Sequence, residues 1–206
     1  IEGDALAVDW PGLVEGPAKV VANLPYNIAT PLVADLLDGV PAIGRMLVMV
    51  QAEVAERLAA GPGDDAYGAV SVKVAYWATA RVVGRVPPTV FLPQPRVDSA
   101  LVDIRRRPAP AVDPAVVAPG ALFAVVRAGF AHRRKMLRRS LAATVAPAAF
   151  ELAGVRPEAR AEELSVADWG HLAAAAAATA AAATAAAPVH EPVPEPEPAP
   201  EEGDGR

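Results

Sequence analysis

An amide, a proline and an aromatic ring follow one another closely in Asn23-Leu24-Pro25-Tyr26, directly after a short apolar run. Small and β-branched apolar residues without helical period predict a buried strand, which the Asn and the Pro would end. Open α/β sheets bind ligands at the carboxyl ends of their strands. The tetrapeptide is therefore either a ligand-binding turn or an ordinary turn whose Tyr packs on the next helix, because turns favour Asn and Pro in any case.

A second ring, Phe91, stands in a loop framed by prolines at positions 87, 88, 93 and 95. The prolines would hold this ring in place at a low entropic cost. The simpler interpretation is that Phe91 anchors the core. Together with Asn23 and Tyr26, however, it predicts a pocket in which two rings enclose a flat ring while an amide contacts its edge. Such a pocket suits a nucleobase removed from its stack.

A run of bases follows further along the chain. At about 100° per residue, residues 122–141 are predicted to form one helix with an apolar arc and a cationic arc. Arg133 falls on the apolar arc, where it would either snorkel or pair with a carboxylate. A solvated face usually mixes both signs, so the run predicts contact with a phosphate backbone rather than solvent exposure alone. The segment contains no acid between its six bases, which are Arg127, Arg133, Arg134, Lys135, Arg138 and Arg139.

Composition narrows the class of protein. The chain has 206 residues, no cysteine and a net charge of −5. The lack of cysteine excludes disulfides and thiol nucleophiles and fits a reducing cytoplasm. No long apolar run predicts a membrane span, and the first residues do not resemble a signal peptide. We expect a cytoplasmic monomer without a metal site. Residues 188–206 hold six acidic residues and one Arg, so the rest of the chain has no net charge. Binding to an anionic partner would therefore depend on local clusters of Lys and Arg.

The order of predicted elements indicates an α/β fold followed by helices. Residues 1–107 alternate strands and helices, and a proline-rich segment at 106–120 marks a boundary. Residues 108–172 are predicted to be helical, and residues 173–206 form an Ala-rich and Pro/Glu-rich low-complexity tail. We expect its acidic part to be disordered, whereas the alanine run could extend the last helix because of its high helix propensity. Strands are expected at 20–23, 44–50 and on both sides of the proline-rich loop within 81–107, with helices at 30–39, 51–61, 71–80 and 121–145.

Four segments in register resemble the KsgA family of ribosomal RNA adenine N6,N6-dimethyltransferases. They are NLPYNIATPL, QAEVAERLAAGPGDDAYGAVSV, VPPTVFLPQPRVDSALV and FAHRRKMLRRSL. The resemblance covers roughly residues 1–172. NLPY alone is less specific, because other amino-group methyltransferases use Asn/Asp-Pro-Pro-Tyr variants.

The resemblance implies a Rossmann-like methyltransferase domain, S-adenosylmethionine (SAM) as methyl donor and a small all-helical RNA-binding domain. The family modifies two adjacent adenosines in the hairpin near the 3′ end of small-subunit rRNA during ribosome assembly. Asn23 matches the Asn of the catalytic motif, and Tyr26 and Phe91 match the rings that stack on the target adenine. Asp4, in GDAL, matches the acidic residue that contacts the adenine of the cofactor.

These residue types suit methyl transfer to an amine of low reactivity. The lone pair of adenine N6 is delocalised into the ring, so N6 is a poor nucleophile. The Asn23 side-chain oxygen and the Leu24 carbonyl could accept the two N6 hydrogens, while Pro25 fixes the turn. Acceleration would come from orientation and from acceptors set up in advance, without a strong base.

One feature departs from the family pattern. The glycine-rich cofactor loop and the acidic residue that holds the cofactor ribose lie upstream of GDAL in the family, so we expect the chain to be truncated at its N-terminus. Two alternatives stay open. One is an Erm-type methyltransferase that acts on large-subunit rRNA, and the other is a non-catalytic assembly factor that binds RNA but no cofactor.

Overall fold

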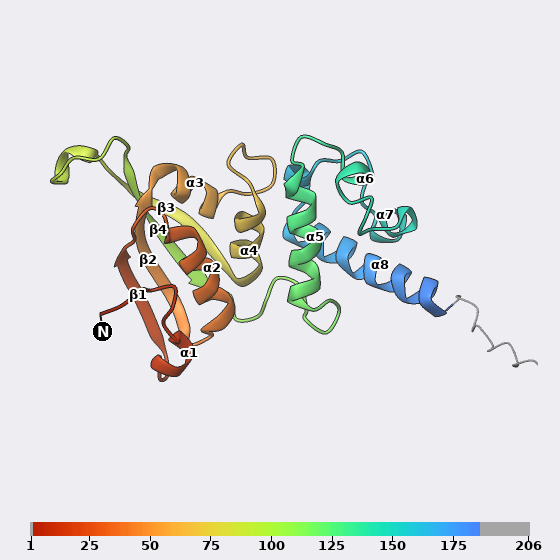
Figure 1. Ribbon diagram of the computed structural model, residues 1–206, viewed down its shortest axis with the longest axis horizontal. Helices are drawn as coiled ribbons and strands as arrows, with labels where there is room; N and C mark the ends of the chain where they lie inside the picture. The colour runs from red at the N-terminus through yellow and green to blue at the C-terminus, as the bar shows by residue number, and fades with distance from the viewer. Residues whose placement is uncertain (1, 186–206) are drawn as a thin grey trace, which may run out of the picture.

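The computed structural model describes residues 2–185 and contains one mixed sheet in the order β1-β2-β4-β3 (Figure 1). β1 and β2 are parallel, and β4 is antiparallel to both of its neighbours. The predicted α/β fold is thus confirmed. The strands are β1 (Ala18–Asn23), β2 (Ile43–Gln51), β3 (Ala78–Val86) and β4 (Ser99–Arg106).

Helices cover one face of this sheet (Figure 1). Along β4 the side chains alternate: Ala100, Val102 and Ile104 join the core beneath the helices, while the intervening residues face the other way. That second face is open at β1, where Val21 is 79% exposed. The covering helices are α1 (Trp10–Leu13), α2 (Ala29–Gly39), α3 (Ala52–Ala59) and α4 (Ala69–Trp77).

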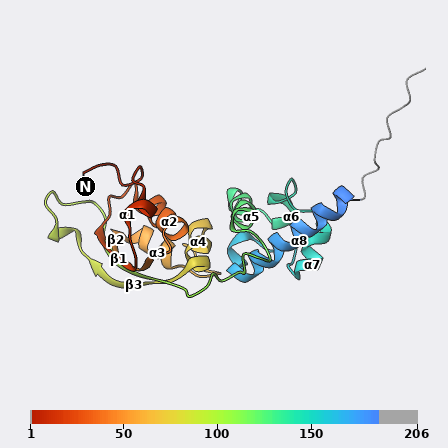
Figure 2. The same ribbon diagram turned by 90° about the horizontal axis from the view of Figure 1, so that it is seen from below.

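Beyond Arg106 the described chain is helical and packs beside α4 (Figure 2). The Trp169 side chain lies at the centre of this part, fully buried against Gly129. Tyr67 and Tyr76 of the α/β part belong to the same apolar cluster, so the two parts share a core. The elements are α5 (Pro119–Ala131), α6 (Leu137–Ser140), α7 (Pro147–Ala153) and α8 (Val166–Ala185), with short 3-10 turns η1 (Pro88–Val90) and η2 (Ala161–Glu163).

The prediction of one continuous helix over 121–145 is wrong. α5 ends at Ala131, and a turn separates it from α6. The Leu137 N–H donates to the Ala159 carbonyl at 2.8 Å, and the Arg138 N–H donates to the Pro157 carbonyl at 3.0 Å. The backbone therefore pairs with a distant segment instead of with its own preceding turn, and consecutive cations in the turn would also repel one another in a helix.

Two further boundaries differ from the predicted ones. The helix predicted at 71–80 ends at Trp77, because Ala78 to Ala80 pair with β4 as the start of β3. Residue 172, the predicted end of the helical part, lies inside α8, which continues to Ala185; the alanine run therefore extends the last helix, as its helix propensity allowed. The expected disorder of the tail concerns residues 186–206, which lie outside the described residues.

Candidate nucleobase-binding site

The structure brings the predicted catalytic and base-stacking residues of the α/β part together around one cavity. Its volume is about 290 Å³, close to the lower end of ligand-pocket volumes, about 300 Å³. The cavity lies at the carboxyl end of β1, where this class of sheet binds ligands. Its lining consists of Asn23, Leu24, Pro25, Tyr26, Phe91, Pro93, Pro95 and Ser99.

The turn after β1 leaves two acceptors available to a ligand. The Leu24 N–H donates to the Met49 carbonyl at 3.0 Å, which ties the turn to β2. The Pro25 carbonyl accepts from Ile28 at 3.2 Å and Ala29 at 3.1 Å, and thereby begins α2. Within residues 2–185, neither the Leu24 carbonyl nor the Asn23 amide takes part in a side-chain or turn hydrogen bond.

The two rings reach the cavity from separate segments. Tyr26 follows β1 and is 40% exposed, so its ring has a face that a ligand can cover. Phe91 follows η1 in the loop that projects from the end of β3 and β4 (Figure 1), and its N–H donates to the Pro88 carbonyl at 3.2 Å. Phe91 is half-buried and does not belong to either core cluster, so it is not the core anchor of the simpler interpretation.

Asp4, the predicted cofactor contact, does not line this cavity. It is exposed, and one of its carboxylate oxygens accepts from the Leu6 N–H at 2.9 Å. The next residue, Ala5, lines an apolar groove of about 430 Å³ between β1 and α2. Leu24 lines both the groove and the cavity, which therefore adjoin.

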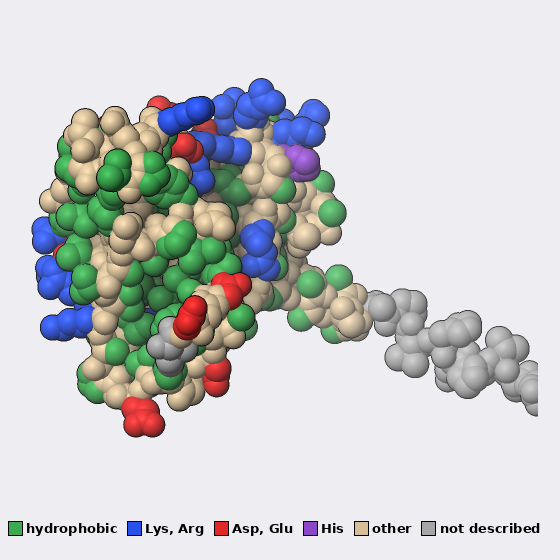
Figure 3. Space-filling model, turned by 60° about the vertical axis from the view of Figure 1, so that its left-hand side comes forward, with side chains coloured by type: hydrophobic (Ala, Val, Ile, Leu, Met, Phe, Trp, Pro, Cys, Tyr) green, Lys and Arg blue, Asp and Glu red, His purple; other side chains and the backbone are tan. Residues whose placement is uncertain are grey.

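The predicted RNA-binding residues lie in the helical part, away from the cavity. Figure 3 shows their side of the molecule, with blue side chains gathered near a purple His. Arg133 forms hydrogen bonds within the protein: it donates to the Glu162 carboxylate at 2.6 Å and to the Asp65 carbonyl at 2.6 Å. Arg138 lies 3.8 Å from Glu158. No carboxylate of residues 2–185 lies within ion-pair distance of the other four, which are Arg127, Arg134, Lys135 and Arg139.

A second charged cluster lies on the open face of the sheet. Asp103 is 2% exposed, and its carboxylate accepts from Arg45 at 2.6 Å and from Arg105 at 2.9 Å, with Arg81 at 3.6 Å. The hydrogen bond from Arg45 holds the pKa of the Asp103 carboxyl below its ordinary value; burial opposes this, and Arg105 adds to it. The same bond raises the pKa of Arg45.

Sequence reasoning missed one polar residue of the cavity wall, Ser99. Its place in the sequence is the one signal for it, because Ser99 comes directly after the Phe91 loop and opens the next strand. It stands two residues before Leu101 and four before Asp103, so the three side chains lie on the same face of that strand. The part of the chain that is described contains no group of three His, Cys, Asp or Glu side chains arranged to hold a metal ion. It also contains no helix long and apolar enough to cross a membrane.

Comparison with known families settles the family. The model of the family described as "Ribosomal RNA adenine dimethylase" matches residues 1–178. The chain belongs to the ribosomal RNA adenine dimethylase family. The predicted resemblance is therefore confirmed, and the match extends into the alanine run of α8.

Relatives in this family carry the name ribosomal RNA small subunit methyltransferase A. The protein of Thermobifida fusca is 52% identical over 162 residues, which are 76% of this chain and 55% of the relative. The protein of Streptomyces coelicolor is 48% identical over 179 residues, 84% of this chain and 61% of the relative. A protein of Xanthomonas campestris is 46% identical over 175 residues, which are 84% of this chain and 66% of the relative. The chain thus spans between about half and two thirds of the length of these relatives.

Two solved structures share the fold. A dimethyladenosine transferase from Plasmodium falciparum superposes with a TM-score of 0.66 at 23% identity, covering 84% of this chain and 70% of that one. The 23S rRNA methyltransferase ErmE superposes with a TM-score of 0.62 at 24% identity, covering 84% of this chain and 69% of that one. At these identities the likeness identifies the fold, an α/β methyltransferase fold with a mixed sheet, and does not separate the two substrates.

Proposed function

We propose that this protein takes part in SAM-dependent dimethylation of N6 of two adjacent adenosines in the 3′-terminal hairpin of small-subunit rRNA. The reaction would take place in the cytoplasm during ribosome assembly. The observation that carries the proposal is the cavity where Asn23, Tyr26 and Phe91 meet. Family membership and the names of the relatives support rRNA as the substrate.

Asn23 and Leu24 would orient the amine. The Asn23 side-chain oxygen accepts one N6 hydrogen and the Leu24 carbonyl accepts the other, which favours a pyramidal nitrogen with its lone pair directed at the methyl group. The Leu24 carbonyl is the better candidate of the two carbonyls in this turn, because the Pro25 carbonyl already accepts two N–H groups. Such acceptors cost no reorganisation during the reaction.

Tyr26 and Phe91 would hold the extruded ring. A base outside its stack loses its neighbours, and stacking on aromatic side chains compensates for this loss. The two rings come from separate loops, and both loops begin at a strand of the sheet. The sheet therefore keeps the rings and the amide acceptor in one arrangement before RNA binds.

Two of the described residues fit SAM as the methyl donor. Asp4 has one carboxylate oxygen without a hydrogen-bond partner in residues 2–185 and would accept from the exocyclic amine of the cofactor's adenine. Asn23 lies where the cofactor and the target adenine would meet. SAM supplies, when bound, a methyl group on a sulfonium sulfur. The adjoining groove and cavity, which share Leu24, support this placement of the two contacts.

We also propose a division of labour between the two parts of the chain. The α/β part, residues 1–107, would belong to a Rossmann-like methyltransferase domain, and the helical part from residue 108 onward would be a domain that contacts the RNA backbone. Arg127, Arg134, Lys135 and Arg139 support this role, because no carboxylate of the described residues neutralises them.

Transfer of labelled methyl groups from SAM to small ribosomal subunits that lack the modification tests the proposal. The protein is expressed from the complete reading frame that contains these residues, beside an Asn23→Ala variant. We expect label in the 3′-terminal hairpin with the wild type and a loss of label in the variant. Label on large-subunit RNA instead would identify an Erm-type enzyme. RNA binding without any transfer would identify a non-catalytic factor.

A further inference from the structure

The cavity that the proposed function uses has one more polar side chain in its wall. Ser99 opens β4 and is 2% exposed, yet it lines the cavity together with Asn23, Tyr26 and Phe91. Its backbone pairs with Gln51 of β2 and Val86 of β3. Ser99 is thus held on both sides by the sheet, and its side chain has a fixed position in the wall.

The Ser99 hydroxyl makes no hydrogen bond to any of residues 2–185. Ser71 shows the contrast: it is equally buried, at 1%, and its hydroxyl donates to the Arg57 carbonyl at 2.5 Å and accepts from the Gly68 N–H at 3.0 Å. Within residues 2–185, the fully buried side-chain polar atoms without a partner are the Tyr76 hydroxyl and the Trp169 ring nitrogen, so the unpaired Ser99 oxygen is not among them and keeps a small accessible surface. A hydroxyl without a protein partner, in the wall of a cavity, is therefore available to whatever occupies that cavity.

Two stacked rings and two acceptors leave one motion of an adenine insufficiently restricted. Stacking between Tyr26 and Phe91 permits rotation of the base within its own plane, and the two hydrogen bonds that N6 donates, to the Asn23 oxygen and the Leu24 carbonyl, resist that rotation only close to N6. A donor that contacts a ring nitrogen at some distance from N6 would stop that rotation. Adenine ring nitrogens beside the amine accept hydrogen bonds, and a serine hydroxyl can donate one.

We propose that Ser99 is a positioning residue, whose hydroxyl donates a hydrogen bond to a ring nitrogen of the target adenine, N1 or N7. This inference rests on the proposed function of the same cavity. The bond keeps the N6 lone pair in line with the methyl group, so its loss lowers the rate of transfer. Because a neutral hydrogen bond contributes modestly, we expect about a three- to tenfold decrease in kcat/KM without it.

The test combines Ser99→Ala with single-atom changes in the RNA. Methyl transfer is measured on a hairpin that carries adenosine, 1-deazaadenosine or 7-deazaadenosine at the target position. For each protein we compare kcat/KM on the analogue with kcat/KM on adenosine. The analogue that lacks the contacted nitrogen should cause a loss in the wild type that is about three to ten times larger than the loss it causes in Ser99→Ala. Ser99→Thr, which keeps a hydroxyl, should retain the sensitivity to that analogue.

A control separates positioning from folding. Ser140→Ala removes a hydroxyl in the helical part whose one side-chain hydrogen bond within residues 2–185 is to the Leu137 carbonyl, at 3.3 Å. It should leave the response to both analogues unchanged. Ser99→Ala should unfold at the same temperature as the wild type or higher, since the hydroxyl that it removes has no hydrogen-bond partner within residues 2–185.

The outcomes distinguish this inference from the function on which it rests. If the wild type transfers methyl groups and each analogue lowers kcat/KM equally in wild type and Ser99→Ala, Ser99 does not contact a ring nitrogen and the inference is wrong. If Ser99→Ala melts well below the wild type, the residue is structural. If the wild type modifies no adenosine in any rRNA, the proposed function fails, and the inference fails with it.

Discussion

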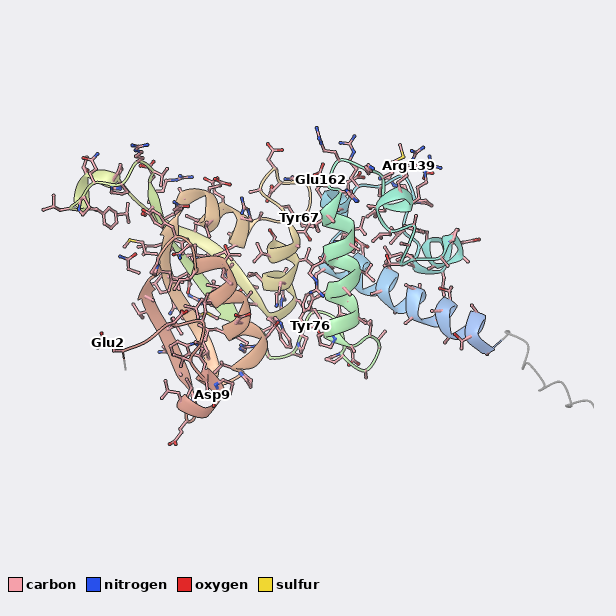
Figure 4. The ribbon with its side chains drawn as sticks, viewed as in Figure 1. Glu2, Asp9, Tyr67, Tyr76, Arg139 and Glu162 are labelled. Atoms are coloured by element: carbon pink, nitrogen blue, oxygen red, sulfur yellow. The ribbon has the colours of Figure 1, made fainter. Side chains whose placement is uncertain are left out.

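The Arg133 guanidinium donates to the Glu162 carboxylate across 2.6 Å, so the end of α5 is tied to η2. Figure 4 shows Glu162 beside this end of α5, with Arg139 on the same side of the helical part. A further bond from Arg133 to the Asp65 carbonyl extends the link to the loop before α4. Of the two roles that the sequence left open for Arg133, snorkelling or pairing, the structure shows pairing.

Arg133 and Arg134 are therefore expected to respond differently to substitution by alanine. Arg133→Ala should lower the free energy of unfolding by about 1 kcal/mol, because a half-exposed ion pair is lost. Arg134→Ala should change it by less than about 0.5 kcal/mol but reduce the salt dependence of RNA binding by about one phosphate contact. Urea denaturation and RNA titrations at several salt concentrations measure the two effects. Equal loss of salt dependence in both variants would contradict this assignment.

Tyr26 should contribute through its ring rather than its hydroxyl. Tyr26→Phe keeps the stacking surface, and the hydroxyl makes no hydrogen bond within the described chain, so methyl transfer should stay close to wild type. Tyr26→Ala should weaken productive RNA binding by roughly five- to 150-fold, the equivalent of one stacked base. Steady-state kinetics on the rRNA hairpin decide this. A large defect in Tyr26→Phe would mean that the hydroxyl, not the ring, binds the substrate.

Gly129 should not accept a side chain. A Cβ atom built there would lie 2.5 Å from the Trp169 ring, which is fully buried. We expect Gly129→Ala to lower the free energy of unfolding by about 1–3 kcal/mol through overpacking. Gly120→Ala in the same helix is the matched control, because no atom outside its chain neighbours and the adjacent helix backbone lies within 4 Å of its Cβ position. It should be neutral or stabilising by up to about 1 kcal/mol, given the helix propensities of the two residues.

Local patterns predicted the elements that are defined by their own hydrophobic periodicity and terminating residues. The apolar run before Asn23 and the helix opened by Thr30-Pro31 appear as β1 and α2, since each depends on periodicity and on terminating residues. The break between α5 and α6 was missed, because its cause is the pairing of Leu137 with Ala159, a residue far downstream. No periodicity in 121–145 contains that information.

In the candidate site, too, some residues could be predicted from the local sequence and others depend on the folded chain. Asn23, Tyr26 and Phe91 were predicted to meet, since amide and aromatic side chains near strand ends are unusual enough to stand out. Ser99 was missed because a serine at the start of a strand is common. The carboxylate partner of Arg133 also became known only from the folded chain, since Glu162 comes from a segment whose position depends on the whole helical core.

Asp103 should make stability depend on pH. Its pKa is lowered in the folded state by Arg45, so the carboxylate stabilises the fold above the ordinary carboxyl pKa of about 3.9. This stabilisation is lost as the pH falls through the lower, folded value. Asp103→Asn should therefore be less stable than the wild type at pH 7, and the difference should narrow below about pH 3.9.

Urea midpoints between pH 3 and pH 7 measure this difference. The control is Asp35→Asn, which removes an exposed carboxylate of α2 that forms no ion pair with the other described residues. Its midpoint should follow that of the wild type throughout. A gap between Asp103→Asn and wild type that stays constant down to pH 3 would show that packing, rather than charge, accounts for the difference.

The prolines of the Phe91 loop also set the length of the β3–β4 hairpin. The ladder ends at the pair Val86 and Ser99, and the loop beyond it contains four residues that have no N–H to donate. If the two strands continued to pair, Phe91 would become one more side chain of a longer ribbon and the cavity would lose a wall. The same missing donors keep the projecting loop from adding to the sheet edge of another molecule. Because these prolines cannot donate, the ladder stops before Phe91, and its ring stays in the loop that lines the cavity.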